Sequence, residues 1–215
     1  MKINSDSIHR LHYISQQASD GSHLTAIHQA LEAGCKWIQL RIKDQNPDEI
    51  LQMAIKAKTF CQVYDAKLIL NDYPEIAAKV QADGLHLGLE DMPILEARKI
   101  VGPDMIIGGT ANTIEHIQQR IQEGANYIGL GPFRFTKTKA KLSPILGIQG
   151  YHDIVKHFKE EQLHIPIIAI GGILSEDLDE LLAAGVHGVA MSGAITFSSN
   201  PKTTVQAIHQ KLQLC

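Results

Sequence analysis

The sequence lacks the marks of secreted, membrane-embedded and nucleic-acid-binding proteins. It has an odd number of cysteines without CxxC spacing, which predicts free thiols in a reducing cytoplasm: Cys35, Cys61 and Cys215. No apolar run approaches the ~18 residues of a membrane span, and residues 1–6 lack the apolar segment of a signal peptide. A formal net charge of −3 without an offsetting Lys/Arg cluster excludes nucleic-acid binding by bulk electrostatics. We expect a soluble cytoplasmic protein in which any anion site is local.

Histidine motifs of the zinc-binding kind are also missing. The 11 histidines include no HxH or HExxH spacing. His86 lies between Leu85 and Leu87 in an expected strand, and we interpret it as a core histidine with satisfied hydrogen bonds rather than a ligand. Most of the other histidines lie on expected helices and are predicted to be surface residues.

Short apolar runs alternate with longer amphipathic segments along the 215 residues. Strands are expected at residues 11–15, 37–41, 67–70, 84–87, 105–108, 126–130, 166–170 and 188–191. Helices are expected near residues 22–33, 47–62, 74–81, 93–101, 113–123, 150–161, 175–184 and 201–213. Strict alternation predicts parallel strands joined by helical crossovers. Units of roughly 25 residues favour an α/β fold of the (β/α)8 TIM-barrel type, with an open doubly wound sheet as the alternative.

The chain shows no linker or low-complexity segment, so one domain is expected over residues 1–215, with residues 1–10 as an N-terminal extension. Asn46 followed by Pro47 predicts a helix start, and Ser175 is predicted to cap another helix. Three glycines are predicted to end helices: Gly34, Gly124 and Gly185.

One expected strand carries an unusual row of polar side chains. Gln39, Arg41 and Lys43 alternate with the apolar residues Ile38, Leu40 and Ile42, so the polar three should project to the same face. In a TIM barrel the chemistry lies at the C-terminal ends of the strands. Two cations at the end of a buried strand predict a bound anion.

Carboxylates follow the next two expected strands. Asn71 and Asp72 come after one of them, and Asp91 follows the other within a few residues. Each could instead cap the helix that comes next. Because two carboxylates at neighbouring strand ends would repel each other, together they predict a divalent cation, and Mg²⁺ typically takes one or two carboxylates plus phosphate oxygens and waters. Arg41 and Lys43 beside such a metal predict a polyphosphate ligand.

The remaining strand ends are rich in small, hydroxyl and cationic residues. Thr110 could donate to an oxyanion, whereas Asn112 could cap a helix. The long loop after residue 130 could be a solvated loop or a cationic cover over an anion, and it contains Thr136, Thr138 and Lys139. The last two strand ends carry a pattern suited to binding phosphate through backbone N–H groups near a short helix: Gly171, Gly172, Ser192 and Gly193.

Taken in order, these motifs resemble the thiamine-phosphate synthase family from about residue 11 to the end of the chain. The motifs are Gln39-x-Arg41-x-Lys43-Asp44, Asn71-Asp72, Asp83-Gly84-Leu85-His86-Leu87-Gly88-x-Glu90-Asp91, Tyr127-Ile128-Gly129-Leu130-Gly131-Pro132, Thr136-x-Thr138-Lys139 and Ala169-Ile170-Gly171-Gly172-Ile173. The resemblance implies a TIM-barrel transferase of a pyrimidinylmethyl group. Such an enzyme joins 4-amino-2-methyl-5-hydroxymethylpyrimidine diphosphate to hydroxyethylthiazole phosphate, with Mg²⁺ as cofactor, and releases thiamine phosphate and pyrophosphate.

The resemblance also implies a role for each matching residue. By likeness, Asp72 and Asp91 are the metal ligands, and Gln39 helps to hold the pyrimidine. Contacts to the diphosphate are implied for Arg41, Lys43, Asn71 and Lys139, of which the three cations are the catalytic residues. Thr110 stands where the family usually has Ser. By the same likeness, the thiazole phosphate is contacted by Thr136, Thr138, Gly172 and the Ser192-Gly193 backbone.

The sequence departs from the family pattern at three places. Leu89 replaces a frequent Gln, Arg134-Phe135 stands where many relatives have an aromatic residue and a proline, and Gly193 stands where Ser is frequent. The second departure could alter closure of its loop, and the third leaves Ser192 as the alternative source of a hydroxyl. A homo-oligomer remains open.

Two other functions are weighed against this one. A related thiazole tautomerase uses the same barrel without metal, but typically lacks the second acidic residue, and here Asp91 is present. A barrel that only binds a thiamine-related phosphate as a sensor would not need the metal ligands and lysines. Both remain alternatives to the transferase.

Overall fold

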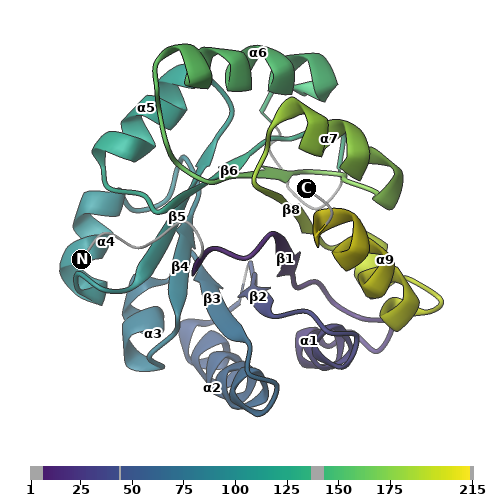
Figure 1. Ribbon diagram of the computed structural model, residues 1–215. Helices are drawn as coiled ribbons and strands as arrows, with labels where there is room; N and C mark the ends of the chain where they lie inside the picture. The colour runs from purple at the N-terminus through teal and green to yellow at the C-terminus, as the bar shows by residue number, and fades with distance from the viewer. Residues whose placement is uncertain (1–6, 44, 137–142, 214–215) are drawn as a thin grey trace.

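A computed structural model describes residues 7–43, 45–136 and 143–213. Its strands form a closed barrel in chain order, in which every neighbouring pair is parallel and the last strand pairs with the first (Figure 1). The strands are Leu11–Ile14 (β1), Trp37–Leu40 (β2), Lys67–Asn71 (β3), Gly84–Leu87 (β4), Ile106–Ala111 (β5), Tyr127–Leu130 (β6), Ile167–Ile170 (β7) and Gly188–Met191 (β8).

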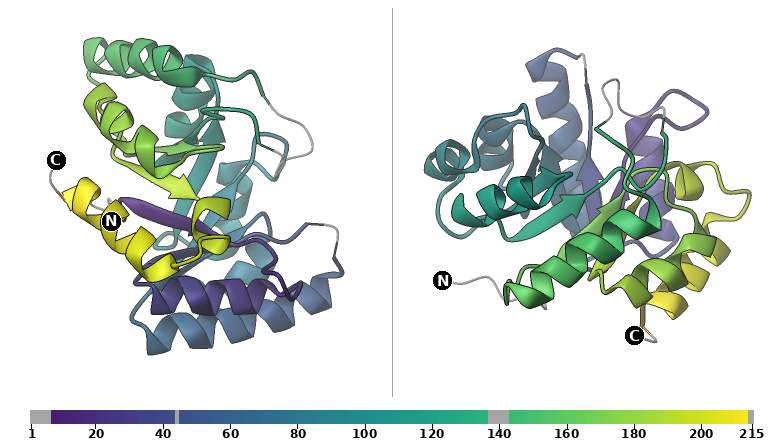
Figure 2. Two further views of the ribbon diagram at one scale, coloured as in Figure 1. Left: turned by 90° about the vertical axis from the view of Figure 1, so that its right-hand side faces the viewer. Right: turned by 90° about the horizontal axis from the view of Figure 1, so that it is seen from above.

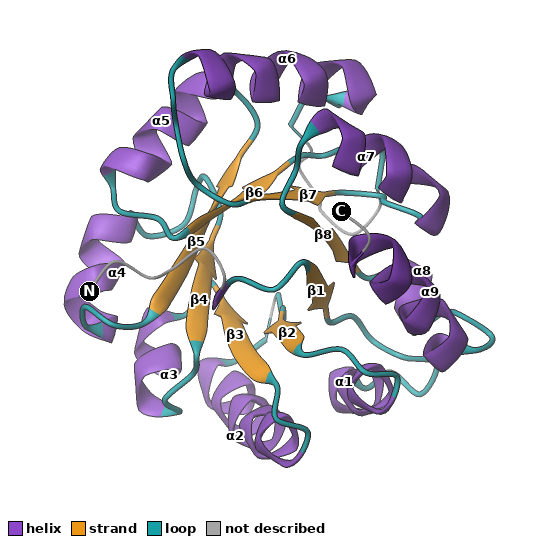
Figure 3. Cartoon of the chain, in the orientation of Figure 1, coloured by secondary structure: helices purple, strands orange, loops and turns teal. Residues whose placement is uncertain are grey.

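Helices form a ring around the barrel, as the purple ribbons outside the orange strands show in Figure 3. They are His23–Glu32 (α1), Pro47–Val63 (α2), Pro74–Lys79 (α3), Ile94–Val101 (α4), Ile114–Gln122 (α5), Gly147–Glu160 (α6), Leu178–Ala184 (α7), Gly193–Thr196 (α8) and Pro201–Gln213 (α9), with a 3-10 turn at Ser175–Asp177 (η2). Helices α1 and α2, which follow each other in sequence, lie side by side in the left panel of Figure 2.

The predicted TIM barrel is confirmed, and each expected strand and helix has a counterpart. Two differences concern the ends of the chemistry-bearing segments. β5 runs on to Ala111, so Thr110 lies within the strand rather than in the loop after it. The short helix α8, which begins directly after Ser192, was predicted only as the helix that such a phosphate site often contains.

Most helix boundaries follow the signals in the sequence. Asn46 accepts a hydrogen bond from the Asp48 N–H at the start of α2. Ser175 was predicted as a cap but makes no capping bond, because Asp177 accepts from the Leu174 N–H at 2.7 Å and the chain first forms η2. The three predicted stops are left-handed, as glycine permits, with φ of 106°, 84° and 102° at Gly34, Gly124 and Gly185.

The core has two layers that alternate along each strand. In β2, Ile38 and Leu40 belong to the large apolar layer between barrel and helices, whereas Trp37 lies in the smaller cluster inside the barrel. Gln39 shares the parity of Trp37, so it lies on the inner face with it. β2 ends at Leu40, one residue before the expected end, so Arg41 and Lys43 of the polar row lie in the segment after the strand.

The described part of the chain forms one domain. Ile8, within the predicted N-terminal extension, packs in the inner cluster. Cys35 and Cys61 are buried free thiols, as expected, and Cys215 lies outside the described residues. Among the described helices, none has the length and apolar character needed to cross a membrane.

Candidate functional site

The C-terminal ends of β2 and β3 are joined by two buried amides. Gln39 Nε2 donates to Asn71 Oδ1 at 2.8 Å, and the two residues are 3% and 6% exposed. The bond fixes the orientation of both amides, because each is held by the other in a site that excludes most water. The two predicted contacts thus form one rigid pair on the barrel's inner face.

Three charged side chains meet beside this pair. The Lys43 ammonium contacts Asp72 Oδ2. The carboxyl groups of Asp72 and Asp91 are hydrogen-bonded to each other, and Asp91 Oδ2 also accepts from the Gly88 N–H at 2.6 Å. Asp72 has a left-handed backbone with φ of 76°, which is uncommon for a residue with a side chain. The structure therefore brings together the two predicted metal ligands and one predicted cation.

The two carboxyl groups have displaced pKa values. Burial, followed by the hydrogen bond with Asp91, raises the pKa of Asp72 to about 6 despite the nearby Lys43. Burial also acts upward on Asp91, but hydrogen bonds with Asp72 and the Gly88 N–H outweigh it and lower the pKa of Asp91. Below about pH 6 the pair shares a proton, because burial of Asp72 and its contact with the second carboxyl group outweigh the charge of the nearby Lys43.

A hard divalent cation fits this pair because it can take the place of the shared proton. Among the described residues there is no group of three or more His, Cys, Asp or Glu side chains that could hold a metal ion. Asp72 and Asp91 can therefore offer two carboxylates only. Mg²⁺, which keeps several waters or takes phosphate oxygens as further ligands, is suited to such an incomplete protein site.

The alternative of helix capping is wrong for both acidic positions. The residue that precedes α3 is Tyr73 and the one that precedes α4 is Pro93, and neither helix start has a side-chain capping bond. Asp72 and Asp91 make their contacts with Lys43, with Gly88 and with each other. Their side chains are thus directed to the site rather than to the following helix.

The raised pKa of Asp72 makes a prediction for the metal-free protein. Between its ordinary value of 3.8 and about 6 the native state keeps a proton that the unfolded chain has lost. The free energy of unfolding should therefore fall as the pH rises through this window, by on the order of 1–3 kcal/mol relative to Asp72→Asn. Urea unfolding of both proteins in EDTA from pH 4 to 7 measures this. A constant difference between them would contradict the shared proton.

Arg41 is held at the site by residues that sequence reasoning missed. Its backbone N–H donates to Ser15 Oγ at 3.1 Å, and Ser15 Oγ lies 3.0 Å from His23 Nδ1. Burial, followed by the charge of Arg41, lowers the pKa of His23. A lone serine and a helical histidine carry no motif, so only the pairing of β1 with β2 reveals their role.

Thr110 and His86 are hydrogen-bonded inside the barrel, with 3.0 Å between Thr110 Oγ1 and His86 Nε2. His86 is a buried histidine with polar partners, as predicted. The capping alternative at Asn112 is wrong, because Thr113 caps α5. Asn112 Nδ2 instead donates to the carbonyl oxygens of Gly131 at 3.0 Å and Pro144 at 2.9 Å.

The loop after β6 is anchored on the loop after β7. The Arg134 guanidinium donates to the Gly172 carbonyl at 3.2 Å and to Asp177 Oδ1 at 2.5 Å, and the Phe133 N–H donates to the Ile170 carbonyl at 2.8 Å. Arg134, a departure from the family pattern, is therefore a structural anchor. Thr136 lies at the end of this anchored stretch, whereas Thr138 and Lys139 lie outside the described residues.

Unpartnered polar atoms surround the predicted phosphate turn after β8. Ser192 Oγ and Gln16 Nε2 are buried atoms that have no hydrogen-bond partner within the described residues. A Cβ at position 193 would lie 3.1 Å from Gln16 Nε2, so the two segments are in close contact. Gln16 is a further residue that sequence reasoning missed. A ligand with oxygen atoms bound beside Gly193 could form the hydrogen bonds that these two polar groups lack within the described residues.

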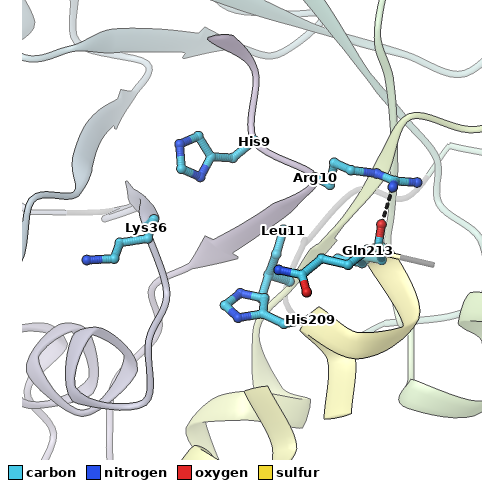
Figure 4. Close-up of a pocket in the computed structure, with 7 residues that line it drawn as sticks. His9, Arg10, Leu11, Lys36, His209 and Gln213 are labelled. Atoms are coloured by element: carbon cyan, nitrogen blue, oxygen red, sulfur yellow. Dashed lines mark hydrogen bonds between the residues drawn. The ribbon is translucent and has the colours of Figure 1, made fainter. Parts of the chain in front are cut away.

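Cavities occur at the opposite end of the barrel, before the strands begin. One, of about 270 Å³, is shown in Figure 4 and is lined by His9, Arg10, Leu11, Lys36, His209, Leu212 and Gln213. Another, of about 340 Å³, is lined by His9, Lys36, Asp65, Ala66, Lys67 and Asp83. Neither cavity is lined by a predicted site residue.

Comparisons with known proteins point to one family. A family model described as thiamine monophosphate synthase matches residues 11–195. The chain is 50% identical over 203 residues to the thiamine-phosphate synthase of Flavobacterium psychrophilum. The aligned region covers 94% of this chain and 98% of that relative. Identity to the thiamine-phosphate synthase of Bacteroides fragilis (strain YCH46) is 48% over 191 residues, or 89% of this chain and 94% of the relative. The solved structure of thiamine phosphate pyrophosphorylase from Pyrococcus furiosus has a TM-score of 0.82 and 29% identity and covers 95% of this chain and 96% of its own.

Proposed function

This chain belongs to the thiamine monophosphate synthase family, the transferases of thiamine biosynthesis, and we propose a specific reaction for it. It joins 4-amino-2-methyl-5-hydroxymethylpyrimidine diphosphate to hydroxyethylthiazole phosphate in a Mg²⁺-dependent step. The products are thiamine phosphate and pyrophosphate. The observation that carries the proposal is the meeting of Lys43, Asp72 and Asp91 beside the buried Gln39–Asn71 pair.

The charged residues act on the leaving group. Asp72 and Asp91 are the residues that would hold Mg²⁺, and the bound ion would supply positive charge to the diphosphate oxygens. The Lys43 ammonium contacts Asp72, and its side chain is 43% exposed, so the ammonium can turn from the carboxylate to a diphosphate oxygen. Arg41 adds a second fixed charge on the same face, and Lys139 has the same role in the proposal. Such preorganised charge is the main requirement when a pyrophosphate group departs.

The amide pair acts on the pyrimidine. Gln39 and Asn71 offer fixed donors and acceptors of the kind that match an aminopyrimidine edge. The C–O bond to the diphosphate breaks with its electron pair going to pyrophosphate, and a C–N bond forms to the thiazole nitrogen. That nitrogen has a lone pair, so no general base is needed. The aminopyrimidine ring can spread positive charge, which favours a dissociative path, and the site must then position the partners and exclude water.

The thiazole phosphate belongs at the turns after β7 and β8 in this proposal. Gly172 and Gly193 allow close approach of the backbone, and Ser192 Oγ is an idle buried hydroxyl beside the start of α8. Thr136 and Thr138 complete the set as predicted hydroxyl donors. The anchored Arg134 holds the β6 and β7 loops together, and this keeps the phosphate side of the site in one arrangement.

One experiment separates this function from its two alternatives. The purified chain is mixed with both phosphorylated substrates, with either omitted, and with EDTA in place of Mg²⁺. We expect pyrophosphate release only when both substrates and Mg²⁺ are present. Binding of both without release would favour the sensor. Isomerisation of a thiazole carboxylate phosphate in EDTA would favour the tautomerase.

Lys43→Ala should separate catalysis from metal binding. We expect kcat to fall about 10²–10³-fold, because a charge on the leaving group is lost. Mg²⁺ binding should become tighter, because the ammonium that contacts Asp72 no longer competes. Steady-state rates and a calorimetric Mg²⁺ titration measure the two effects. Lys58→Ala is the matched control, since Lys58 pairs with Asp83 at 2.8 Å, before β4 and away from the site. Weaker Mg²⁺ binding with normal kcat would refute the assignment.

A further inference from the structure

Three side chains from three adjacent strands form a hydrogen-bonded series inside the barrel. Tyr127 Oη on β6 lies 3.0 Å from His86 Nδ1 on β4, and His86 Nε2 lies 3.0 Å from Thr110 Oγ1 on β5. Tyr127 and His86 are buried, at 1% and 5% exposure, while Thr110 is partly exposed. The series thus leads from the barrel core to the open end where Asp91 and Lys43 lie.

Two glycines leave the space that the side chains of Tyr127 and His86 occupy. His86 and Tyr127 both pair in register with Gly108 of the strand between them, and Thr110 pairs with Gly129. A Cβ at Gly108 would lie 2.0 Å from Tyr127 Cζ, and one at Gly129 would lie 2.9 Å from His86 Cε1. The side chains of His86 and Tyr127 therefore meet across β5 at Gly108, where that strand has no side chain between them. The contact is built into the register of the sheet.

The protons of this series can be assigned by counting donors. If Tyr127 O–H donates to His86 Nδ1, then His86 Nε2–H donates to Thr110 Oγ1, and each hydrogen has an acceptor. In the other neutral tautomer, Nδ1–H would donate to Tyr127 Oη. The phenolic hydrogen would then have no acceptor, because the described residues give Tyr127 Oη no other partner. A buried donor without an acceptor costs about 1–3 kcal/mol, which selects the first arrangement.

Two further observations agree with that direction. Burial raises the pKa of Tyr127, so its hydroxyl keeps the proton that it must donate. Thr110 Oγ1, once it accepts from His86, retains its own hydrogen, and within the described part of the chain no other group is hydrogen-bonded to that oxygen. The hydroxyl proton of Thr110 is thus left for a ligand.

We propose that Tyr127 and His86 are positioning residues that fix the Thr110 hydroxyl as a hydrogen-bond donor to an anionic substrate oxygen. This inference rests on the proposed function, in which the oxygen belongs to the diphosphate. Without the two rings, the Thr110 hydroxyl could rotate and act as an acceptor, which would repel an oxyanion. With them its proton is committed before the substrate binds, so no reorganisation is needed as charge develops on the leaving group.

A double-mutant cycle tests the relay during catalysis. Thr110→Val removes the donor and should lower kcat about 10–100-fold with a smaller change in KM, while Thr110→Ser should retain most of the rate. Tyr127→Phe should lower kcat about 3–10-fold, because the ring stays and only the hydroxyl is lost. In the Thr110→Val background Tyr127→Phe should have no further effect on kcat. Effects that multiply, or a Tyr127→Phe rate equal to wild type, would overturn the relay.

A second measurement does not depend on turnover. Long-range ¹H–¹⁵N NMR of the histidine side chains in the wild-type protein, assigned with His86→Gln, reports which ring nitrogen of His86 carries the proton. We expect the Nε2–H tautomer. The Nδ1–H tautomer would overturn this inference even if the protein makes thiamine phosphate. Conversely, the expected tautomer in a protein that releases no pyrophosphate would refute the proposed reaction and leave the hydrogen-bond assignment standing.

Discussion

Replacing Asp91 with alanine is expected to lower turnover about 10²–10³-fold at millimolar Mg²⁺ while the barrel stays folded. Asp91 lies in the turn between β4 and α4, where its carboxylate contacts the Gly88 N–H and Asp72. The apolar layers on either side of the strands do not include it. Its loss leaves Asp72 alone with Lys43, and one carboxylate that is already neutralised by an ammonium is a poor metal ligand.

Two measurements and a neighbouring control define this result. Pyrophosphate release gives the rate, and the rise in melting temperature on adding Mg²⁺, expected in the wild type, should vanish in Asp91→Ala. Glu90→Ala removes the same charge one residue earlier and should keep both properties, because Glu90 is not one of the two proposed metal ligands. A near-normal rate in Asp91→Ala would remove the basis for the metal site.

Gly108→Ala is expected to lower the free energy of unfolding by about 3 kcal/mol or more. The added Cβ would lie 2.0 Å from Tyr127 Cζ. The ring cannot withdraw easily, because its centroid lies 5.7 Å from that of Trp37, 5.1 Å from that of His12 and 5.5 Å from that of His86. The barrel must therefore shift a strand or expel the ring, and either change also breaks the Tyr127–His86 hydrogen bond.

A second substitution shows whether the ring is the cause. In a Tyr127→Leu background the same Gly108→Ala change should cost less than about 1 kcal/mol, because the smaller side chain leaves room for the methyl group. Urea denaturation of the wild type, the two single variants and the double variant provides the cycle. Equal costs in both backgrounds would mean that the backbone at position 108, rather than the space taken by Tyr127, requires glycine.

The architecture was predictable because each unit carries its own signal. Apolar runs with helix stops at Gly34 and Gly185 mark strands and helices locally, and alternation along β2 indicates that Gln39 faces the interior. The end of β5 was missed because Gly-Gly-Thr lacks apolar alternation, although pairing with β4 and β6 extends the strand to Ala111. The four residues of α8 are too few to show helical periodicity.

The sequence predicted individual residues of the candidate site but not the hydrogen bonds between them. Asp72 and Asp91 stood out as carboxylates at strand ends, and the structure places them together. Their hydrogen-bonded neighbours did not stand out, since the partners are far apart in sequence: Gln39 and Asn71 are separated by 32 positions and His86 and Thr110 by 24. Such pairs depend on strand register.

The ion pair of Arg134 with Asp177 is another contact that the sequence did not predict. The sequence marked it as a departure that could alter loop closure. Its partner Asp177 lies 43 positions further on and is buried, so the pairing could not be deduced from the loop itself. A buried carboxylate requires a compensating charge, and Arg134 provides it while also holding the Gly172 carbonyl.

The most direct test of the proposed reaction is the stoichiometry of its products. Wild-type protein is incubated with Mg²⁺ and both substrates, and pyrophosphate and thiamine phosphate are quantified in the same sample over time. We predict equal amounts of the two products at every time point and neither product in EDTA. Pyrophosphate without thiamine phosphate would show hydrolysis of the diphosphate rather than transfer, and it would contradict the two-substrate site at the end of this barrel.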